Sequence, residues 1–240
     1  MAYAFFIDTT VCTGCRGCQV ACKQWHDLPA EETRNRGGYQ NPPDLSFNTY
    51  KLVRMNEQII DNRLQWLFFP EQCRHCIDAP CLETAGDEGA IYKDQATGAI
   101  LYTEVTKELA TDDIIQSCPY NVPRKGAGGA LAKCDMCNDR IHNGKLPACV
   151  KTCPTGAMNF GPRAEMIQLA RARLAEVKTK HPKAMLADPD EVSVIYLIAY
   201  EPNSYFVNVI ASAGTGGIPR QMALHRMLRP FSKAAKAIRG

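Results

Sequence analysis

The pattern of apolar and polar positions along the chain predicts strands in short apolar runs at its beginning and in its last quarter. YAFFID, residues 3–8, has the length and apolar content of a buried strand. VSVIYLIAY, residues 192–200, is an apolar run that stops at the polar EPNS, which favours a buried strand over a membrane span. We expect YFVNVIA, residues 205–211, to pair with it. TYKLVRM, residues 49–55, is a further strand candidate.

Two other stretches have helical spacing. A short helix is expected over residues 18–25, within the first cysteine-rich segment. Residues 161–182 predict an amphipathic helix that has a proline near its start and ends at a His-Pro step. Its apolar stripe is suited to core packing and consists of Met166, Ile167, Ala170, Leu174 and Val177.

Length and charge narrow the class of protein. A chain of 240 residues with a formal net charge of +3 can build one large or two small cores, and its charge balance gives no reason to expect nucleic-acid binding. We expect no signal peptide, because MAYAFFIDTT lacks a basic start and reaches an acid at Asp8. We expect no transmembrane segment, because no apolar run approaches the length of a membrane-spanning helix. The tail from Arg220 to Arg239 is basic. It is interpreted equally as a clamp on an acidic partner or as a solvated helix, with membrane-surface binding a weaker reading.

Twelve cysteines distinguish this chain from an ordinary globular protein. They fall into four groups along the sequence. The first is Cys12, Cys15, Cys18 and Cys22, the second Cys73, Cys76 and Cys81, the third Cys118 alone, and the fourth Cys134, Cys137, Cys149 and Cys153.

The first group has the C-x2-C-x2-C-x3-C spacing of bacterial ferredoxins. Such a loop places three thiolates on one [4Fe–4S] cube, while the cysteine three residues further on reaches a different cluster. Six disulfides are an alternative, but cysteines two residues apart pair poorly. Zinc is an alternative for the fourth group, whose spacing also suits a four-cysteine zinc site. Zinc does not account for the crowded first group.

At this point the chain resembles the iron–sulfur electron-transfer subunits of molybdenum- or tungsten-pterin oxidoreductases. These subunits partner formate dehydrogenases and the reductases of dimethyl sulfoxide, nitrate and polysulfide. The resemblance rests on CTGCRGCQVACKQW, CRHCIDAPC, SCPYNVPR and CDMCNDRIHNGKLPACVKTCPTGA, which cover most of residues 1–160. It implies an α+β fold of two ferredoxin-like [4Fe–4S] units, one inserted in the other, followed by a C-terminal helix and an extended tail.

The expected domain boundaries follow from the motifs and from composition. The first unit comprises residues 1–28 and 129–160, and the second comprises residues 66–128. Residues 29–65, rich in Pro, Gly and Asn, form an insertion between them. Residues 161–240 hold the helix, the strand pair and the basic tail.

The chain departs from the family pattern at one site. Members usually carry four further cysteines, which would fall at Ala85, Glu108, Thr111 and Ile114 of this sequence. By the ligand exchange that the resemblance implies, those four positions belong to a single cluster. One whole site is therefore missing, while its neighbour keeps every ligand.

Three clusters then use all twelve cysteines. Cluster one takes Cys12, Cys15, Cys18 and Cys153. Cluster two takes Cys22, Cys134, Cys137 and Cys149. Cluster three takes Cys73, Cys76, Cys81 and Cys118.

We expect an electron relay rather than an enzyme. Every expected cluster has four protein ligands, and the five histidines are scattered without a catalytic motif. Four basic residues near the cysteine loops are candidates for offsetting cluster charge, with ordinary surface positions as the alternative: Arg16, Lys23, Arg74 and Lys133.

CKQWHDLP and YLIAYEPNSY most resemble the small subunit of soluble formate dehydrogenases. The resemblance implies a large molybdenum- or tungsten-pterin catalytic subunit as partner in a heterodimer, and a soluble acceptor such as a cytochrome c. The same relay in another pterin enzyme, such as a polysulfide, dimethyl-sulfoxide or nitrate reductase, is the alternative, and a zinc-bound interaction module is a weaker one. A periplasmic location, reached by export with a signal-bearing partner, is expected, with the cytoplasm as the alternative.

Overall fold

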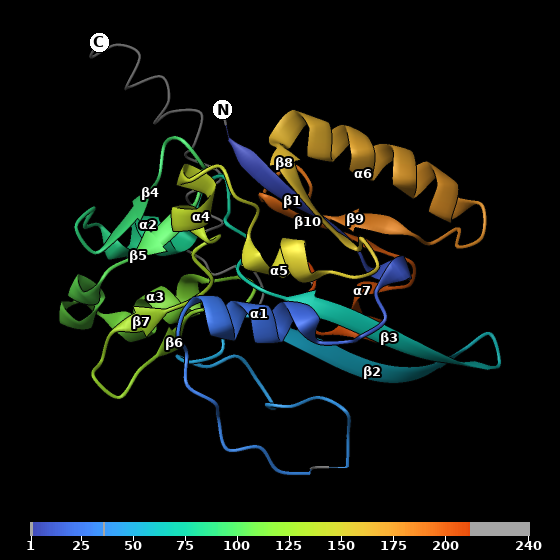
Figure 1. Cartoon of the computed structure of the whole chain (residues 1–240), viewed down its shortest axis with the longest axis horizontal. Coiled ribbons are helices and arrows are strands. Elements are labelled where there is room, and N and C mark those ends of the chain that lie inside the picture. The colour runs from blue at the N-terminus through green and yellow to red at the C-terminus, as the bar shows by residue number, and fades with distance from the viewer. Residues whose placement is uncertain (1, 36, 212–240) are drawn as a thin grey trace.

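A four-stranded sheet brings together a strand from the beginning of the chain and three strands from residues 158–198. The structure is a computed structural model that describes residues 2–35 and 37–211. The sheet has the order β8 (Met158–Pro162), β1 (Tyr3–Asp8), β10 (Val194–Ile198) and β9 (Met185–Ala187). The central strands β1 and β10 are parallel and each outer strand is antiparallel to its neighbour (Figure 1). The strands predicted at 3–8 and within 192–200 are confirmed.

Both faces of this sheet are covered, which explains why its central strands are apolar without alternation. Helix α6 (Arg163–Lys178) packs on one face, where Phe6 and Ile195 meet Ala170. On the other face, Tyr196 stacks on Phe69 of a long hairpin, with ring centroids 4.4 Å apart. That hairpin consists of β2 (Leu52–Ile60) and β3 (Arg63–Glu71).

The predicted strand over 205–211 is wrong. The segment instead holds the end of a short helix, α7 (Pro202–Tyr205), followed by turns. Pro202 begins the helix, and the backbone N–H of Ala199 donates to the Tyr205 hydroxyl, which folds the segment back against the end of β10. The edge beside β10 is occupied by β9, which the sequence pattern did not predict.

The other predicted elements are confirmed with changed bounds. The helix expected over 161–182 is α6, and residues 158–162 before it form β8. The helix expected over 18–25 is α1 (Gly17–Trp25). The strand candidate at 49–55 begins at Leu52 and continues to Ile60. Its pairing with β3 runs across residues 65 and 66, so one hairpin joins the expected insertion to the expected second unit.

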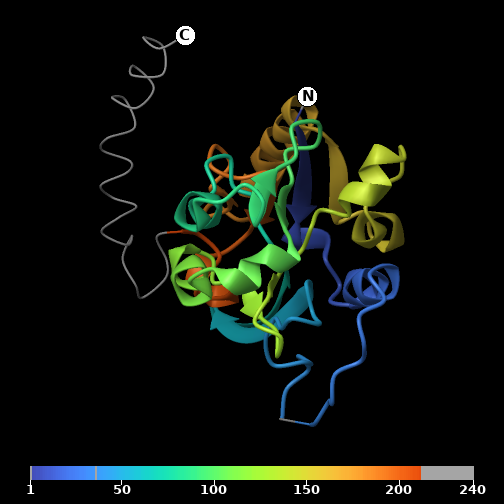
Figure 2. The ribbon, with the colours of Figure 1, turned by 90° about the vertical axis from the view of Figure 1, so that its left-hand side faces the viewer.

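The remaining elements are short and carry the cysteine loops. One group lies to the side of the sheet and includes the second and third cysteine groups (Figures 1 and 2). It contains α2 (Pro80–Ala85), β4 (Ile91–Lys93), β5 (Ile100–Tyr102), η2 (Glu104–Glu108), α3 (Thr111–Ser117), β6 (Arg124–Lys125) and β7 (Leu131–Ala132). Nearer the sheet lie η1 (Thr9–Val11), α4 (Asn138–His142) and α5 (Ala148–Thr152).

The fold is a mixed α+β fold, as predicted. The nested arrangement of two units and its boundaries stay predictions. Within residues 2–35 and 37–211, no helix is both long enough and apolar enough to span a bilayer. The basic tail, Arg220 to Arg239, lies outside the described residues.

Candidate metal-cluster sites

All twelve cysteines lie in the described part of the chain, and all are free thiols. The disulfide alternative therefore has no support in the structure. Most of the thiols are buried or half-buried, and Cys15 alone among the twelve is exposed. Buried free thiols gathered from distant segments need another reason for their proximity, and a shared metal group supplies one.

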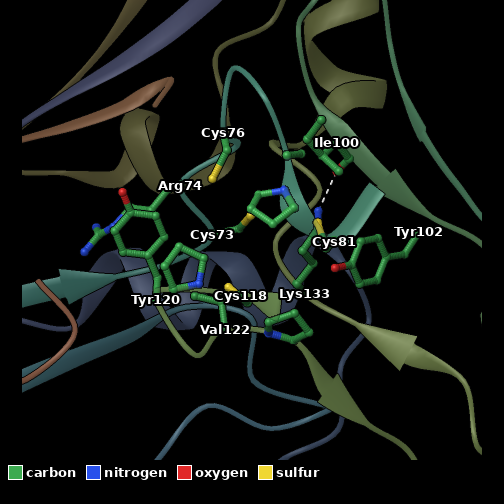
Figure 3. Close-up of a pocket in the computed structure, with 14 residues that line it drawn as sticks. Cys73, Arg74, Cys76, Cys81, Ile100, Tyr102, Cys118, Tyr120, Val122 and Lys133 are labelled. Carbon is green, nitrogen blue, oxygen red and sulfur yellow. Dashed lines mark hydrogen bonds between the residues drawn. The ribbon is translucent and has the colours of Figure 1, made fainter. Parts of the chain in front are cut away.

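The first gathering of thiols lies between α2 and α3 in a cavity of about 340 Å³. Cys81 lies in the first turn of α2, and Cys118 caps the end of α3. Figure 3 shows the sulfur atoms of Cys73, Cys76, Cys81 and Cys118 around one common space. The structure thus joins the second cysteine group to the solitary third.

The second gathering lies in a cavity of about 320 Å³ beside the hairpin. The hairpin contributes Val53 and Pro70 to its wall. Helices α1 and α5 pack closely: a Cβ on Gly17 would lie only 3.2 Å from the Thr152 side chain. This packing brings the lining cysteines of the two segments together. Four thiols line the cavity: Cys12, Cys15, Cys18 and Cys153.

The third gathering is formed by the cysteines that remain. Cys22 lies on α1 and Cys149 on α5, while Cys134 and Cys137 precede α4. All four are buried. Burial raises the pKa of Cys22 well above its ordinary value, and the neighbouring thiols of Cys149 and Cys137 raise it further. Cys22 therefore faces the fourth cysteine group rather than its own loop.

Three C-x-x-C loops share one backbone feature. Their third residues, Gly14, His75 and Met136, all have left-handed φ angles, of +66°, +45° and +68°. The backbone N–H of His75 donates to the sulfur of Cys73, and that of Met136 to the sulfur of Cys134, each at 3.4 Å. Such bonds favour the thiolate form that a metal requires. The left-handed conformation is costly for His and Met, and strain of this kind marks functional loops.

Burial sets the protonation state of most of these thiols. Burial raises the pKa of Cys18, Cys118 and Cys137 to about 12, so without a metal these thiols stay protonated at neutral pH. Metal binding replaces those protons. Cys153 differs: burial acts to raise its pKa, but the Thr155 hydroxyl and nearby backbone N–H groups outweigh burial and lower it.

The residues present fit an iron–sulfur cluster in the cavity of Figure 3. The Tyr102 hydroxyl is buried there with no hydrogen-bond partner in the described structure. Figure 3 shows this hydroxyl directed toward Cys81. A sulfur-rich anionic group among the four thiols would accept a hydrogen bond from it.

The comparisons with known proteins agree with this chemistry. A 4Fe-4S dicluster domain matches residues 64–163. Formate dehydrogenase subunit beta of Megalodesulfovibrio gigas is 59% identical over 215 residues, covering 88% of this chain and 100% of the relative. The chain belongs to the formate dehydrogenase beta subunits.

Two further relatives support the assignment. Formate dehydrogenase 2 subunit beta (cytochrome c-553) of Nitratidesulfovibrio vulgaris Hildenborough is 52% identical, over 86% of this chain and 97% of the relative. The formate dehydrogenase-O iron-sulfur subunit of Escherichia coli K12 is 39% identical, over 84% of this chain and 69% of the relative. This beta subunit is thus a non-catalytic, iron–sulfur electron-transfer subunit of an oxidoreductase complex, and its partner is a catalytic alpha subunit.

In this beta subunit, three of the four positions at which the family resemblance implied further cysteines lie in buried or half-buried protein interior. Ile114 is 1% exposed and packs with Ile91, Ile100 and Leu131, and the half-buried Ala85 joins the same cluster. Thr111 is buried, and Glu108 is exposed. Apolar side chains therefore fill the region in which the resemblance implied a further cluster.

We expect Ile114→Val to lower the free energy of unfolding by about 0.5–1.5 kcal/mol without changing the iron content, because it removes one buried methyl group from a packed core. Anaerobic denaturation and iron analysis measure both effects. Gln116→Ala, at an exposed position of the same helix, is the control and should change stability by less than about 0.5 kcal/mol. Loss of iron in Ile114→Val would show that the position supports a cluster after all.

The four basic residues singled out from the sequence separate into two pairs. Arg16 and Lys23 hold the loop of the insertion, donating to the carbonyls of Tyr39 and Asn48 respectively. Arg74 and Lys133 are buried and line the cavity of Figure 3. Sequence reasoning overlooked a fifth basic residue, Lys51, which is also buried. It lies just before β2, which contains charged and polar residues of every degree of exposure, so nothing in the pattern distinguished it.

Proposed function

We propose that this beta subunit holds three [4Fe–4S] clusters and passes electrons from a molybdenum- or tungsten-pterin catalytic subunit that oxidises formate to a soluble acceptor such as a cytochrome c. One observation carries the proposal: eight of the twelve cysteines line two cavities in sets of four, each set combining distant segments, and the other four are buried as neighbours of one another. Exchange of ligands between loops accounts for this arrangement.

The ligand sets follow from the three gatherings. Cluster one would be held by Cys12, Cys15, Cys18 and Cys153, cluster two by Cys22, Cys134, Cys137 and Cys149, and cluster three by Cys73, Cys76, Cys81 and Cys118. Clusters one and two would belong to a first ferredoxin-like unit, residues 1–28 and 129–160, and cluster three to an inserted unit, residues 66–128. The position of Cys22 and Cys149 on α1 and α5, which also carry the cluster-one loop and Cys153, supports the pairing of the first two.

Each cluster, when bound, supplies a one-electron redox centre. The chain fills every corner of each cluster with its own thiolate, so no iron is left open to substrate. Val53 and Pro70 give the cavity of the cluster-one set an apolar wall on the side of the hairpin. Oxidation of formate on the partner, HCOO⁻ → CO₂ + H⁺ + 2 e⁻, would deliver two electrons to this chain in succession.

A cytochrome acceptor is proposed because one 52% identical relative is named for cytochrome c-553. We propose a periplasmic location, reached together with a signal-bearing partner, on the basis of the family resemblance and that relative. A polysulfide, dimethyl-sulfoxide or nitrate reductase partner is the competing assignment. The formate dehydrogenase relatives favour the first assignment.

We expect the complex purified anaerobically through this chain to contain a large pterin subunit and to lose most of its broad visible absorption when formate is added, because formate electrons reduce the clusters. Absorption spectroscopy measures the bleaching, and dithionite defines complete reduction. Re-oxidation by an added c-type cytochrome tests the acceptor. Bleaching by dithionite alone, with re-oxidation by polysulfide, dimethyl sulfoxide or nitrate, would assign the relay to another pterin enzyme.

A further inference from the structure

A buried cation, Lys51, lies beside the cavity of the cluster-one set, because Pro70, whose carbonyl accepts from it, lines that cavity. Lys51 is only 2% exposed, and its ammonium donates to the carbonyl of Pro70, at 3.4 Å, and to the side-chain oxygen of Gln72. Both acceptors are neutral. In the described residues no carboxylate forms an ion pair with Lys51. A buried ammonium without an anion is strongly unfavourable, so the compensating negative charge must come from elsewhere.

Clusters bound to the thiolates of both sets would supply that negative charge. Burial lowers the pKa of the Lys51 ammonium, but Cys149 and Cys18 outweigh it and raise that pKa above its ordinary value. Conversely, Lys51 opposes the rise that burial causes in the pKa of four thiols. Two of them belong to the cluster-one set and two to the cluster-two set: Cys12, Cys18, Cys22 and Cys149.

A second buried lysine occupies the corresponding place between the cluster-two and cluster-three sets. Lys133 is 6% exposed and lines the cavity of the cluster-three set. Its ammonium donates to the carbonyls of Ile100 and, at 3.1 Å, of Cys134, a member of the cluster-two set. Figure 3 shows it reaching toward Cys81, and it also lies 4.5 Å from the centre of the Tyr102 ring. No carboxylate pairs with Lys133 among the described residues.

We propose that Lys51 and Lys133 are internal countercharges, one in each gap between consecutive clusters, and that each raises the reduction potentials of the two clusters it separates. The proposal rests on the three-cluster relay proposed above. A cluster with four thiolates gains one negative charge when it is reduced, and a fixed positive charge nearby stabilises that reduced state. In a buried site water screens this effect little.

The test is a redox titration of the intact complex, followed by electron paramagnetic resonance. We expect Lys51→Met to make reduction of clusters one and two at least tenfold less favourable, a shift of about 59 mV or more to negative potential, and to leave cluster three unchanged. Lys133→Met should shift clusters two and three and leave cluster one unchanged. The signals are assigned with Cys12→Ala, which removes cluster one, and Cys118→Ala, which removes cluster three.

Lys151→Met is the matched control, because Lys151 lies within two residues of Cys149 and Cys153 but is exposed to water. Its effect should be much smaller than that of Lys51→Met. Should Lys51→Met fail to assemble, Lys51→Arg and Lys51→Gln decide the matter. Retention of clusters one and two by the arginine variant alone supports a role for the charge, and equal loss in both variants overturns it.

The outcomes distinguish this inference from the proposed function. A titration that resolves fewer than three four-iron centres, or a complex that formate does not reduce, would contradict the proposed relay itself. Three normal centres whose potentials move equally in Lys51→Met, in Lys133→Met and in the surface control would contradict only the countercharge role.

Discussion

We expect Cys12→Ala combined with Cys22→Ala to remove two clusters, although the two cysteines belong to one run of eleven residues. Cys12 lines the cavity that includes Cys153, whereas Cys22 neighbours Cys137 and Cys149. Each substitution therefore removes one ligand from a different proposed set of four. Mössbauer and electron paramagnetic resonance spectroscopy should detect one intact four-iron centre in the double variant, against three in the parent protein.

The matched control is Cys12→Ala combined with Cys153→Ala. These two residues are more than a hundred positions apart, yet they line the same cavity. The pair should remove one cluster and leave two intact centres, because a second ligand lost from the same set costs no further cluster. If each cysteine run instead held its own cluster, the two double variants would exchange their results. That exchange would refute the proposed ligand sets.

We expect Gly14→Ala to destabilise the protein by about 2–5 kcal/mol and to release cluster one. Two effects add at this position. Its φ of +66° is costly for any residue with a Cβ, and a Cβ placed there would lie 2.7 Å from the Phe68 ring. Phe68 belongs to β3, so the hairpin presses directly on the loop that carries Cys12 and Cys15.

Gly144→Ala separates these two effects. Gly144 has nearly the same φ, +67°, but no atom lies within 4 Å of the position of its Cβ. The Gly144→Ala variant should lose only the conformational part of the free energy of unfolding, about 1–2 kcal/mol, and keep every cluster. Anaerobic denaturation compares the stabilities, and counting intact centres compares the clusters. Equal losses in the two variants would show that contact with Phe68 is unimportant.

The cysteines that are candidate cluster ligands could be identified from the sequence, because ligand spacing is a local property, and their division into three sets stays a prediction. Two residues between cysteines set how three thiolates approach one cube, whatever surrounds the loop. The prediction that a fourth site is missing has the same basis, since the side chains of Ala85 and Ile114 cannot bind iron. The sequence could not show that these residues pack with Ile91 and Ile100 in an apolar cluster.

The fold was predictable only in part. Apolar runs identified β1 and β10, but periodicity does not reveal which strands pair. The partner expected at 205–211 failed because Pro202 begins a helical turn there, while the short strand β9 took the edge of the sheet. Only the first strand of hairpin β2–β3 was predicted from the sequence. The predicted range, 49–55, begins three residues before β2, and β3 was not predicted at all.

By itself, the sequence determined that this beta subunit is suited to bind iron–sulfur clusters, because thiolate chemistry and spacing act over a few residues. Only the tertiary structure decided which distant thiols meet, and that Lys51 and Lys133 lie buried between them. The physical reason is that proximity across many residues, and the burial of a charge, depend on how helices and hairpins pack together.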